Sequence, residues 1–255
     1  MLRFSVVDFL NARPLIWGLL ENPPPGVHVS RDAPSACADK LASGEADVGL
    51  IPSIEYQRIP DLRVVPDLGI AAASEVRSVL LVSSVARDRI GSVALDPASR
   101  TSAVLTRLLL KRRYHVEPLY RDPGARTDAA LVIGDPALKT RLNRKVVLDL
   151  AAEWRAFSGH PFVFAFWAMR PGVEASEVWR VVRDSYKAAR REFPRLVAKE
   201  AAESGLSEAV VDDYLRHSLH YELDAGDLEG LELFYRLAAE DGQIPAARPL
   251  EFAPG

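Results

Sequence analysis

A chain of 255 residues can bury a substantial core, either as one large domain or as two modest ones. Apolar residues make up 48% and charged residues 26%, which excludes a disordered or fibrous chain, and the formal net charge of -3 disfavours nucleic acid as a main partner because that function needs Lys and Arg in excess. Cys37 is the single cysteine, so an internal disulfide and a cysteine-based zinc cluster are both excluded. Its helical surroundings favour a small buried apolar residue over a nucleophile.

The beginning of the sequence, MLRFSVVDFLNARPL, lacks the long apolar core of a signal peptide, because Arg3, Asp8 and Arg13 interrupt it. No window approaches the run of about 18 apolar residues that a membrane span needs. We therefore expect a cytoplasmic protein without a membrane partner.

Short apolar runs typical of strands alternate with helical patterns through most of the chain. The predicted strands are 2–7, 47–51, 62–68, 78–82, 92–95, 116–119, 129–133, 146–149 and 161–170. Helices are predicted for 35–43 and 101–113, and three more close the chain at 176–193, 207–217 and 228–240. This alternation predicts an α/β fold with mixed, mainly parallel sheets and a C-terminal helical segment.

Two stretches rich in charge and turn residues, 83–92 and 167–176, are the best candidates for domain boundaries. Two separated crossing points indicate that one domain is inserted into another. We expect residues 1–87 and 167–255 to form the first lobe and residues 88–166 to form the second, with a ligand cleft between the lobes.

Polar residues follow several predicted strands at the point where a helix begins. They are Asn11, Ser53, the run of Ser99, Arg100, Thr101 and Ser102, and the pair Gly134 and Asp135. Each can simply cap or open a helix, and the spacing alone favours that interpretation. However, ligands of open α/β sheets bind beyond the carboxyl ends of the strands, and helix starts stabilise anions. Several such ends together favour a shared cleft for a carboxylate or phosphate.

Familiar cofactor and catalytic motifs are missing from the sequence. It contains no GxGxxG after a strand, no GxxxxGK[ST], no HExxH and no GxSxG. His217 and His220 have a spacing at which two imidazoles can share a metal, but no third ligand accompanies them, so we predict no metal site. His160, before Pro161, is either a turn residue or a cleft residue.

Several stretches resemble one known family when taken together. In order along the chain they are LNARPL, GEADVGLIPSIEY, VRSVLLVSS, ALDPASRTS, LVIGDPAL, SGHPFVFAFWAMR and YLRHSLHYELDAGDLEGLELFYRLA. They are similar to the chorismate dehydratases of the futalosine pathway of menaquinone biosynthesis, within the superfamily that resembles periplasmic binding proteins. The resemblance covers almost the whole chain, and ADVGLIPSIEY and SRTS are its most specific parts.

The resemblance implies a two-lobed type II periplasmic-binding-protein-like fold that holds its substrate in the cleft. It further implies a hydro-lyase that converts chorismate to 3-[(1-carboxyvinyl)oxy]benzoate and water, with no metal or organic cofactor. The two carboxylates of chorismate then each require a binding site in the cleft. The candidate binding residues are Ser53, Ser78, Ser99, Arg100, Thr101, Ser102, Gly134 and His160. Among them, Ser99, Thr101 and Ser102 are expected to hold one carboxylate, and Ser78 with Arg77 either lines the cleft or braces the hinge.

The sequence leaves two alternatives for the base that removes the proton. Asp135 is one candidate base, and a carboxylate of the substrate is another, while Asn11 can orient the departing hydroxyl. Two alternative functions remain: a non-catalytic binding protein for a small carboxylate, since the fold also serves receptors, and the related 1,4-dihydroxy-6-naphthoate synthase. The sequence does not predict the oligomeric state.

Overall fold

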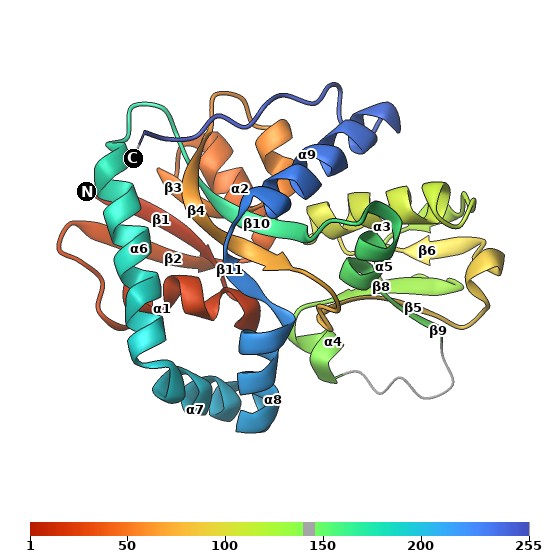
Figure 1. Ribbon diagram of the computed structural model, residues 1–255, viewed down its shortest axis with the longest axis horizontal. Coiled ribbons are helices and arrows are strands. Elements are labelled where there is room, and N and C mark those ends of the chain that lie inside the picture. The colour runs from red at the N-terminus through yellow and green to blue at the C-terminus, as the bar shows by residue number, and fades with distance from the viewer. Residues whose placement is uncertain (140–145, 255) are drawn as a thin grey trace.

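The computed structural model describes residues 1–139 and 146–254 and arranges them in two lobes, each built on one sheet (Figure 1). The first sheet has the strand order β11-β4-β10-β3-β1-β2. Its strands are β1 (Leu2–Val7), β2 (Val27–Asp32), β3 (Val48–Pro52), β4 (Arg63–Ala72), β10 (Phe162–Met169) and β11 (His220–Glu222). The second sheet has the order β7-β6-β8-β5-β9. Its strands are β5 (Val79–Ser83), β6 (Ser92–Ala94), β7 (Leu119–Arg121), β8 (Ala129–Ile133) and β9 (Val146–Asp149).

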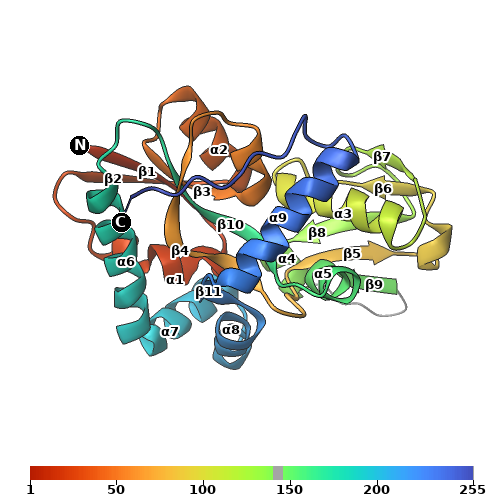
Figure 2. The same cartoon turned by 45° about the horizontal axis from the view of Figure 1, so that its top comes forward.

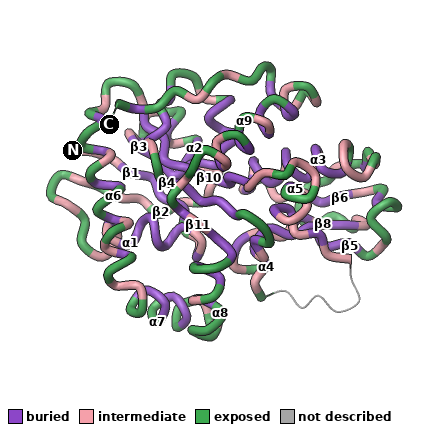
Figure 3. Tube along the Cα trace, viewed as in Figure 1, coloured by how far each residue is buried: buried purple, intermediate pink, exposed green. Residues whose placement is uncertain are grey.

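Helices pack on both sheets, and central strands such as β3 and β10 are buried along their whole length, whereas the edge strands β2 and β7 are partly exposed (Figure 3). The first lobe carries α1 (Arg13–Glu21), α2 (Pro34–Ser43), α6 (Ala175–Arg191), α7 (Phe193–Ser204) and α8 (Glu208–Asp213). The second carries α3 (Arg100–Arg112), α4 (Asp135–Lys139) and α5 (Leu150–Ser158), and α9 (Ala225–Glu240) is the last helix. Shorter helical turns are η1 (Leu10–Ala12), η2 (Ser53–Gln57), η3 (Arg87–Arg89) and a π-helical turn at Tyr214–Ser218.

The predicted α/β class with mixed sheets is confirmed, but parallel pairing does not dominate. β1 runs parallel to β2 and β3, and β6 runs parallel to β7 and β8. In contrast, β5 and β10 are antiparallel to both of their neighbours. β5 begins where the chain enters the second lobe, and β10 begins where it re-enters the first, so each runs away from the other lobe. Their neighbours β8 and β3 instead end at the side of the sheet that faces the other lobe. The entry strands therefore reverse the direction that the alternating pattern predicts.

The chain crosses between the lobes at places that differ from the predicted boundaries. Because β5 pairs with β8 and β9, it belongs to the second sheet, although the sequence pattern predicts it within the first-lobe segment 1–87. β10 lies wholly in the first sheet, although the expected boundary at 166 cuts it. The crossings thus fall in residues 73–78 and 159–161. Both are short, whereas the charged stretches 83–92 and 167–176 begin at the ends of β5 and β10 and continue into the segments that follow them.

Helix α9 spans the two lobes in addition to the chain crossings (Figure 2). It begins in a capping box in which Asp224 and Asp227 bond each other's backbone N–H groups. Directly after its end, Asp241 forms ion pairs of 2.9 and 2.8 Å with Lys111 and Arg112 of α3. The chain then returns to the first lobe, where Ala253 donates a backbone hydrogen bond to Val64 of β4. We call α9 with this ion-paired end the α9 strap.

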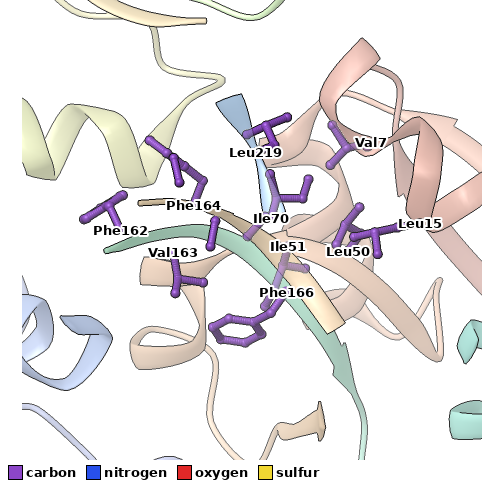
Figure 4. Close-up of a cluster of buried hydrophobic side chains, with 14 of the residues drawn as sticks. Val7, Leu15, Leu50, Ile51, Ile70, Phe162, Val163, Phe164, Phe166 and Leu219 are labelled. Atoms are coloured by element: carbon purple, nitrogen blue, oxygen red, sulfur yellow. The ribbon is translucent and has the colours of Figure 1, made fainter. Parts of the chain in front are cut away.

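The core of the first lobe is apolar, and β3, β4 and β10 contribute many of its side chains (Figure 4). Its labelled members in the figure are Val7, Leu15, Leu50, Ile51, Ile70, Phe162, Val163, Phe164, Phe166 and Leu219. Burial of such side chains is the main stabilising contribution to the fold. Within the described residues, no helix combines the length and the apolar character that crossing a bilayer requires.

Candidate functional site

A small pocket lies between the lobes, at the ends of β1, β3 and β8 and at the start of α3. Its volume is about 60 Å³. The lining residues are Val7, Phe9, Asn11, Pro34, Pro52, Ile70, Val79, Ser99, Thr101, Ser102, Ile133, Gly134, Phe164 and Ala165. Five residues that the sequence predicts for the site are therefore brought together here. No Lys, Arg or His is among the described residues of this lining. The positive potential that would stabilise a bound carboxylate therefore has to come from backbone N–H groups.

The start of α3 presents such backbone groups. Ser99 occupies the N-cap position, but its side chain accepts no hydrogen bond from the helix. Instead, its Oγ donates to the Oγ of Ser102 at 2.7 Å. Simple capping, the plainer of the two sequence interpretations, is thus not what Ser99 does. The amides of the first turn keep their positive helix-dipole end without a side-chain cap, which is the arrangement that stabilises a bound carboxylate.

Thr101 connects the two lobes. Its Oγ1 accepts a hydrogen bond of 3.2 Å from the backbone N–H of Ile54 and lies 3.4 Å from the Oγ of Ser53. Ser53 is fully buried and does not line the pocket. Its hydroxyl donates to the carbonyl of Val163 at 2.8 Å, and its own carbonyl accepts from Tyr235 at 2.6 Å. The Ser53 side chain therefore holds η2 against β10 in this conformation.

Arg100 is also engaged in contacts between the lobes rather than in the pocket lining. Its guanidinium lies 2.8 Å from the Glu55 carboxylate and 2.9 Å from Asp39. Burial lowers the pKa of Arg100, but the hydrogen bonds to Glu55 and Asp39 outweigh this effect and raise it above the usual value. The group stays charged, and its charge is directed at these two carboxylates.

Asn11 lines the pocket from the first lobe, in the η1 turn that follows β1. Its Oδ1 is buried, and no hydrogen-bond donor of the described residues reaches it. A buried polar atom without a partner is uncommon in folded proteins and usually marks strain, a bound water or a functional group. In this pocket it provides an acceptor for a donor on a ligand.

Gly134 and Asp135 stand at the end of β8. Gly134 has a φ of 63°, a left-handed backbone conformation that favours glycine, and a Cβ at this position would touch the ring of Phe9 at 3.4 Å. The Oδ1 of Asp135 accepts a hydrogen bond of 3.2 Å from the backbone N–H of Leu10. Asp135 is not part of the pocket lining. It joins the second lobe to the turn that carries Asn11.

Ser78 lies in the first crossing and does not line the pocket, although Val79 beside it does. The Oγ of Ser78 accepts a hydrogen bond of 2.6 Å from the hydroxyl of Tyr214, and burial raises the pKa of that phenol. Arg77 has a φ of 62°; its backbone N–H donates to Asp149, and its guanidinium pairs with Asp213. Of the two predicted roles for Arg77 and Ser78, these bonds match bracing of the hinge.

The histidines lie outside the pocket. His160 is at the second crossing, with its Nδ1 at 3.8 Å from Glu229 on α9. The Nε2 of His220 lies 2.8 Å from Asp227. Across residues 1–139 and 146–254, no three His, Cys, Asp or Glu side chains gather in a way that could hold a metal ion.

The apolar part of the lining is what the sequence interpretation misses. Phe9, Ile70, Val79, Ile133 and Phe164 enclose the polar groups in the pocket. Phe9 could have been found, because it stands two residues before Asn11 in the same turn. The other four belong to continuous apolar strands and carry no local signal that separates a pocket wall from an ordinary core.

The chain is similar to proteins of known identity. It is 29% identical over 234 residues to a protein of Thermus thermophilus named chorismate dehydratase, which covers 82% of this chain and 86% of the relative. A protein of the same name from Campylobacter jejuni is 26% identical over 240 residues, covering 91% of this chain and 96% of the relative.

Among solved structures, the periplasmic aliphatic sulphonate binding protein of Escherichia coli matches with a TM-score of 0.63 at 18% identity, over 100% of this chain and 94% of that one. This likeness confirms the predicted periplasmic-binding-protein-like fold. A family model described as menaquinone biosynthesis matches residues 2–240, so the chain belongs to this family.

Proposed function

We propose that this protein is a chorismate dehydratase, a cytoplasmic carbon–oxygen lyase that converts chorismate to 3-[(1-carboxyvinyl)oxy]benzoate and water. The names of the relatives from Thermus thermophilus and Campylobacter jejuni support this proposal, since both align over most of their length. Membership of the menaquinone biosynthesis family supports it as well.

One juxtaposition in the pocket carries the proposal. The first lobe contributes the Oδ1 of Asn11, an acceptor without a partner, and the second lobe contributes the start of α3 without a side-chain cap. Chorismate carries a hydroxyl, which can donate to such an acceptor, and carboxylates, which fit a helix start. The apolar walls suit the ring between them. We assign the departing hydroxyl to Asn11 and one carboxylate to the start of α3.

The reaction needs a base and a fixed geometry. A proton leaves the ring carbon that bears the enolpyruvyl ether, the neighbouring hydroxyl leaves, and together they form water while the ring becomes aromatic. Aromatisation supplies the driving force, so a weak base is sufficient. Asp135 accepts a bond from Leu10 and lies outside the lining, which favours a carboxylate of the substrate as the base.

The pocket has to widen before a substrate can enter. Its volume of about 60 Å³ is far below the roughly 300–1,000 Å³ of typical ligand sites. Bonds between the lobes, such as that of Thr101 to Ile54, then have to break and re-form in each turnover. The described conformation corresponds to closed lobes.

The decisive experiment mixes the purified protein with chorismate and follows the ultraviolet absorbance of the aromatic product. We expect an enolpyruvyl benzoate to accumulate without added metal or nucleotide, and mass spectrometry to show the loss of one water. Tight binding of chorismate without turnover would instead favour a receptor for small carboxylates. Neither binding nor turnover would favour the related naphthoate synthase.

A further inference from the structure

The π-helical turn Tyr214–Ser218 places one phenol against the first crossing between the lobes. Tyr214 begins this turn directly after α8, and its hydroxyl donates to the Oγ of Ser78 at 2.6 Å. Both residues are buried, with exposed fractions of 1% and 0%. π-helical turns are rare and occur often at functional sites, where they redirect a side chain. The phenol is therefore held at a place where the chain departs from regular geometry.

Ser78 is directly connected to the pocket wall. Its carbonyl accepts a hydrogen bond of 2.8 Å from the backbone N–H of Gly134, which lines the pocket. Val79, the next residue along the chain, lines it too. A shift of Ser78 would therefore be transmitted to two lining residues of the candidate site.

The hydroxyl of Ser78 acts as a hydrogen-bond acceptor and not as a donor within the described residues. A serine hydroxyl offers one proton and two acceptor positions, and the bond from Tyr214 occupies one of the acceptor positions. Ser78 donates its own proton to no group within the described residues, although buried hydroxyl donors are normally paired. Because Ser78 is fully buried and lies outside the pocket lining, the bond from Tyr214 is the contact that fixes this hydroxyl.

Neighbouring contacts hold Tyr214 in place. Arg77 lies over its ring at 5.9 Å from the centroid, and the same guanidinium pairs with Asp213, the residue before Tyr214. Asp149 fixes the backbone of Arg77 in its left-handed conformation by accepting from its N–H at 2.6 Å. The contact between Tyr214 and Ser78 is thus supported from both sides.

We propose that Tyr214 is a positioning residue for the dehydration: by donating to Ser78, it fixes the residue whose carbonyl binds Gly134 and whose chain neighbour is Val79, and so keeps these two lining residues in the geometry that binds the substrate. This inference rests on the proposed function, because it concerns the same pocket. Tyr214 itself touches no substrate atom. Its effect passes through the orientation of Ser78.

The test compares Tyr214→Phe with Tyr221→Phe. Tyr221 is a matched control, because its hydroxyl is also buried but has no partner in the described part of the chain. We expect Tyr214→Phe to raise the KM for chorismate about tenfold, because two lining residues lose their fixed position, with a smaller change in kcat. Tyr221→Phe should leave both constants within about twofold.

A double-variant cycle separates positioning from a general loss of structure. Ser78→Ala should raise KM at least as much as Tyr214→Phe, and Ser78→Ala combined with Tyr214→Phe should be no worse than Ser78→Ala alone. Fully additive effects, or a Tyr214→Phe variant that matches Tyr221→Phe in KM, would overturn the proposal. If Tyr214→Phe does not fold, an unchanged KM in Ser78→Ala overturns it.

Titration calorimetry with chorismate distinguishes this proposal from the proposed function. Binding by the unaltered protein without turnover would refute the dehydratase, and the comparison of Tyr214→Phe with Tyr221→Phe would then be made on Kd. An equal Kd for the two variants would refute the positioning role. If the unaltered protein neither binds nor converts chorismate, both proposals fail.

Discussion

Arg100 of the second lobe and Glu55 of the first lobe form an ion pair, with 2.8 Å between Nη1 and Oε2. The carboxylate of Glu55 is almost fully buried, and it also binds Arg58 within its own lobe. Arg100 is therefore the group that ties the two lobes together at this point. The sequence predicts the same residue as a substrate contact, and the two roles differ in measurable ways.

Replacement of Arg100 tests these roles. We expect Arg100→Ala to lower the free energy of unfolding by about 1–3 kcal/mol, because Glu55 loses one of its two charged partners in a dry environment. Urea denaturation measures this change, and the KM for chorismate should stay within about threefold. Asp39→Asn is the control, since this exposed partner should contribute at most about 1 kcal/mol. A large rise in KM at unchanged stability would return Arg100 to substrate binding.

Asn11→Ala should separate catalysis from stability. If Asn11 orients the departing hydroxyl, kcat should fall about 100-fold through loss of the productive geometry. The melting temperature should not fall, because the buried Oδ1 has no hydrogen bond to lose. Steady-state kinetics and thermal unfolding check the two halves. Asn22→Ala, at the end of α1, is the matched control and should change neither. A loss of stability with normal turnover would indicate a structural role.

The α9 strap should weaken in acid. Burial raises the pKa of Asp241, but hydrogen bonds from Arg112 and Lys111 outweigh this and bring it below its usual value. A carboxylate with a lowered pKa in the folded state stabilises the fold above its unfolded pKa of about 3.9, and this contribution is lost as the pH falls through the folded pKa.

We therefore expect Asp241→Asn to cost about 1–2 kcal/mol at pH 7 and progressively less below about pH 4. Urea unfolding of both proteins from pH 7 to pH 3 measures the difference. Asp212→Asn, in an exposed pair with Arg216 on one helical face, should show almost no difference at any pH. A constant cost for Asp241→Asn across the range would contradict the ion-pair explanation.

Cys37 should resist thiol reagents in the folded protein. Burial raises the pKa of its thiol to about 12, and the side chain is inaccessible on the buried face of α2. At pH 8 we expect no release of thionitrobenzoate from Ellman's reagent within an hour, and one equivalent after guanidinium is added. Rapid labelling of the folded protein would show that α2 opens readily.

Much of the fold follows from local patterns in the sequence. The predicted bounds of β1, β8 and β9 match the structure, because each is a short apolar run between turn residues. β2 escapes prediction, since its sequence VHVSRD is half polar at the sheet edge. α7 is missed because Pro194 follows Phe193 and breaks the pattern, although proline is tolerated in the first turn of a helix.

The candidate site is predictable where it depends on strand ends. Asn11, Ser99 and Gly134 reach one pocket because β1, β6 and β8 all end toward the other lobe. The sequence does not reveal which polar groups are already engaged across the lobes. The partners of Thr101 and Arg100 lie more than forty positions away, at Ile54 and Glu55, and no local spacing encodes such pairs.

Trp154 lies where the chain returns from the second lobe. Its indole N–H donates to the carbonyl of Pro161 at 3.0 Å, and its ring centroid lies 5.5 Å from that of Phe162 on β10 and 6.0 Å from that of Phe234 on α9. Separation of the lobes would alter the polarity around this indole. Trp154 is one of four tryptophans, and the protein thus carries a native fluorophore at its pivot. The part of the tryptophan emission that changes when the lobes separate offers a label-free signal for opening and closing in real time.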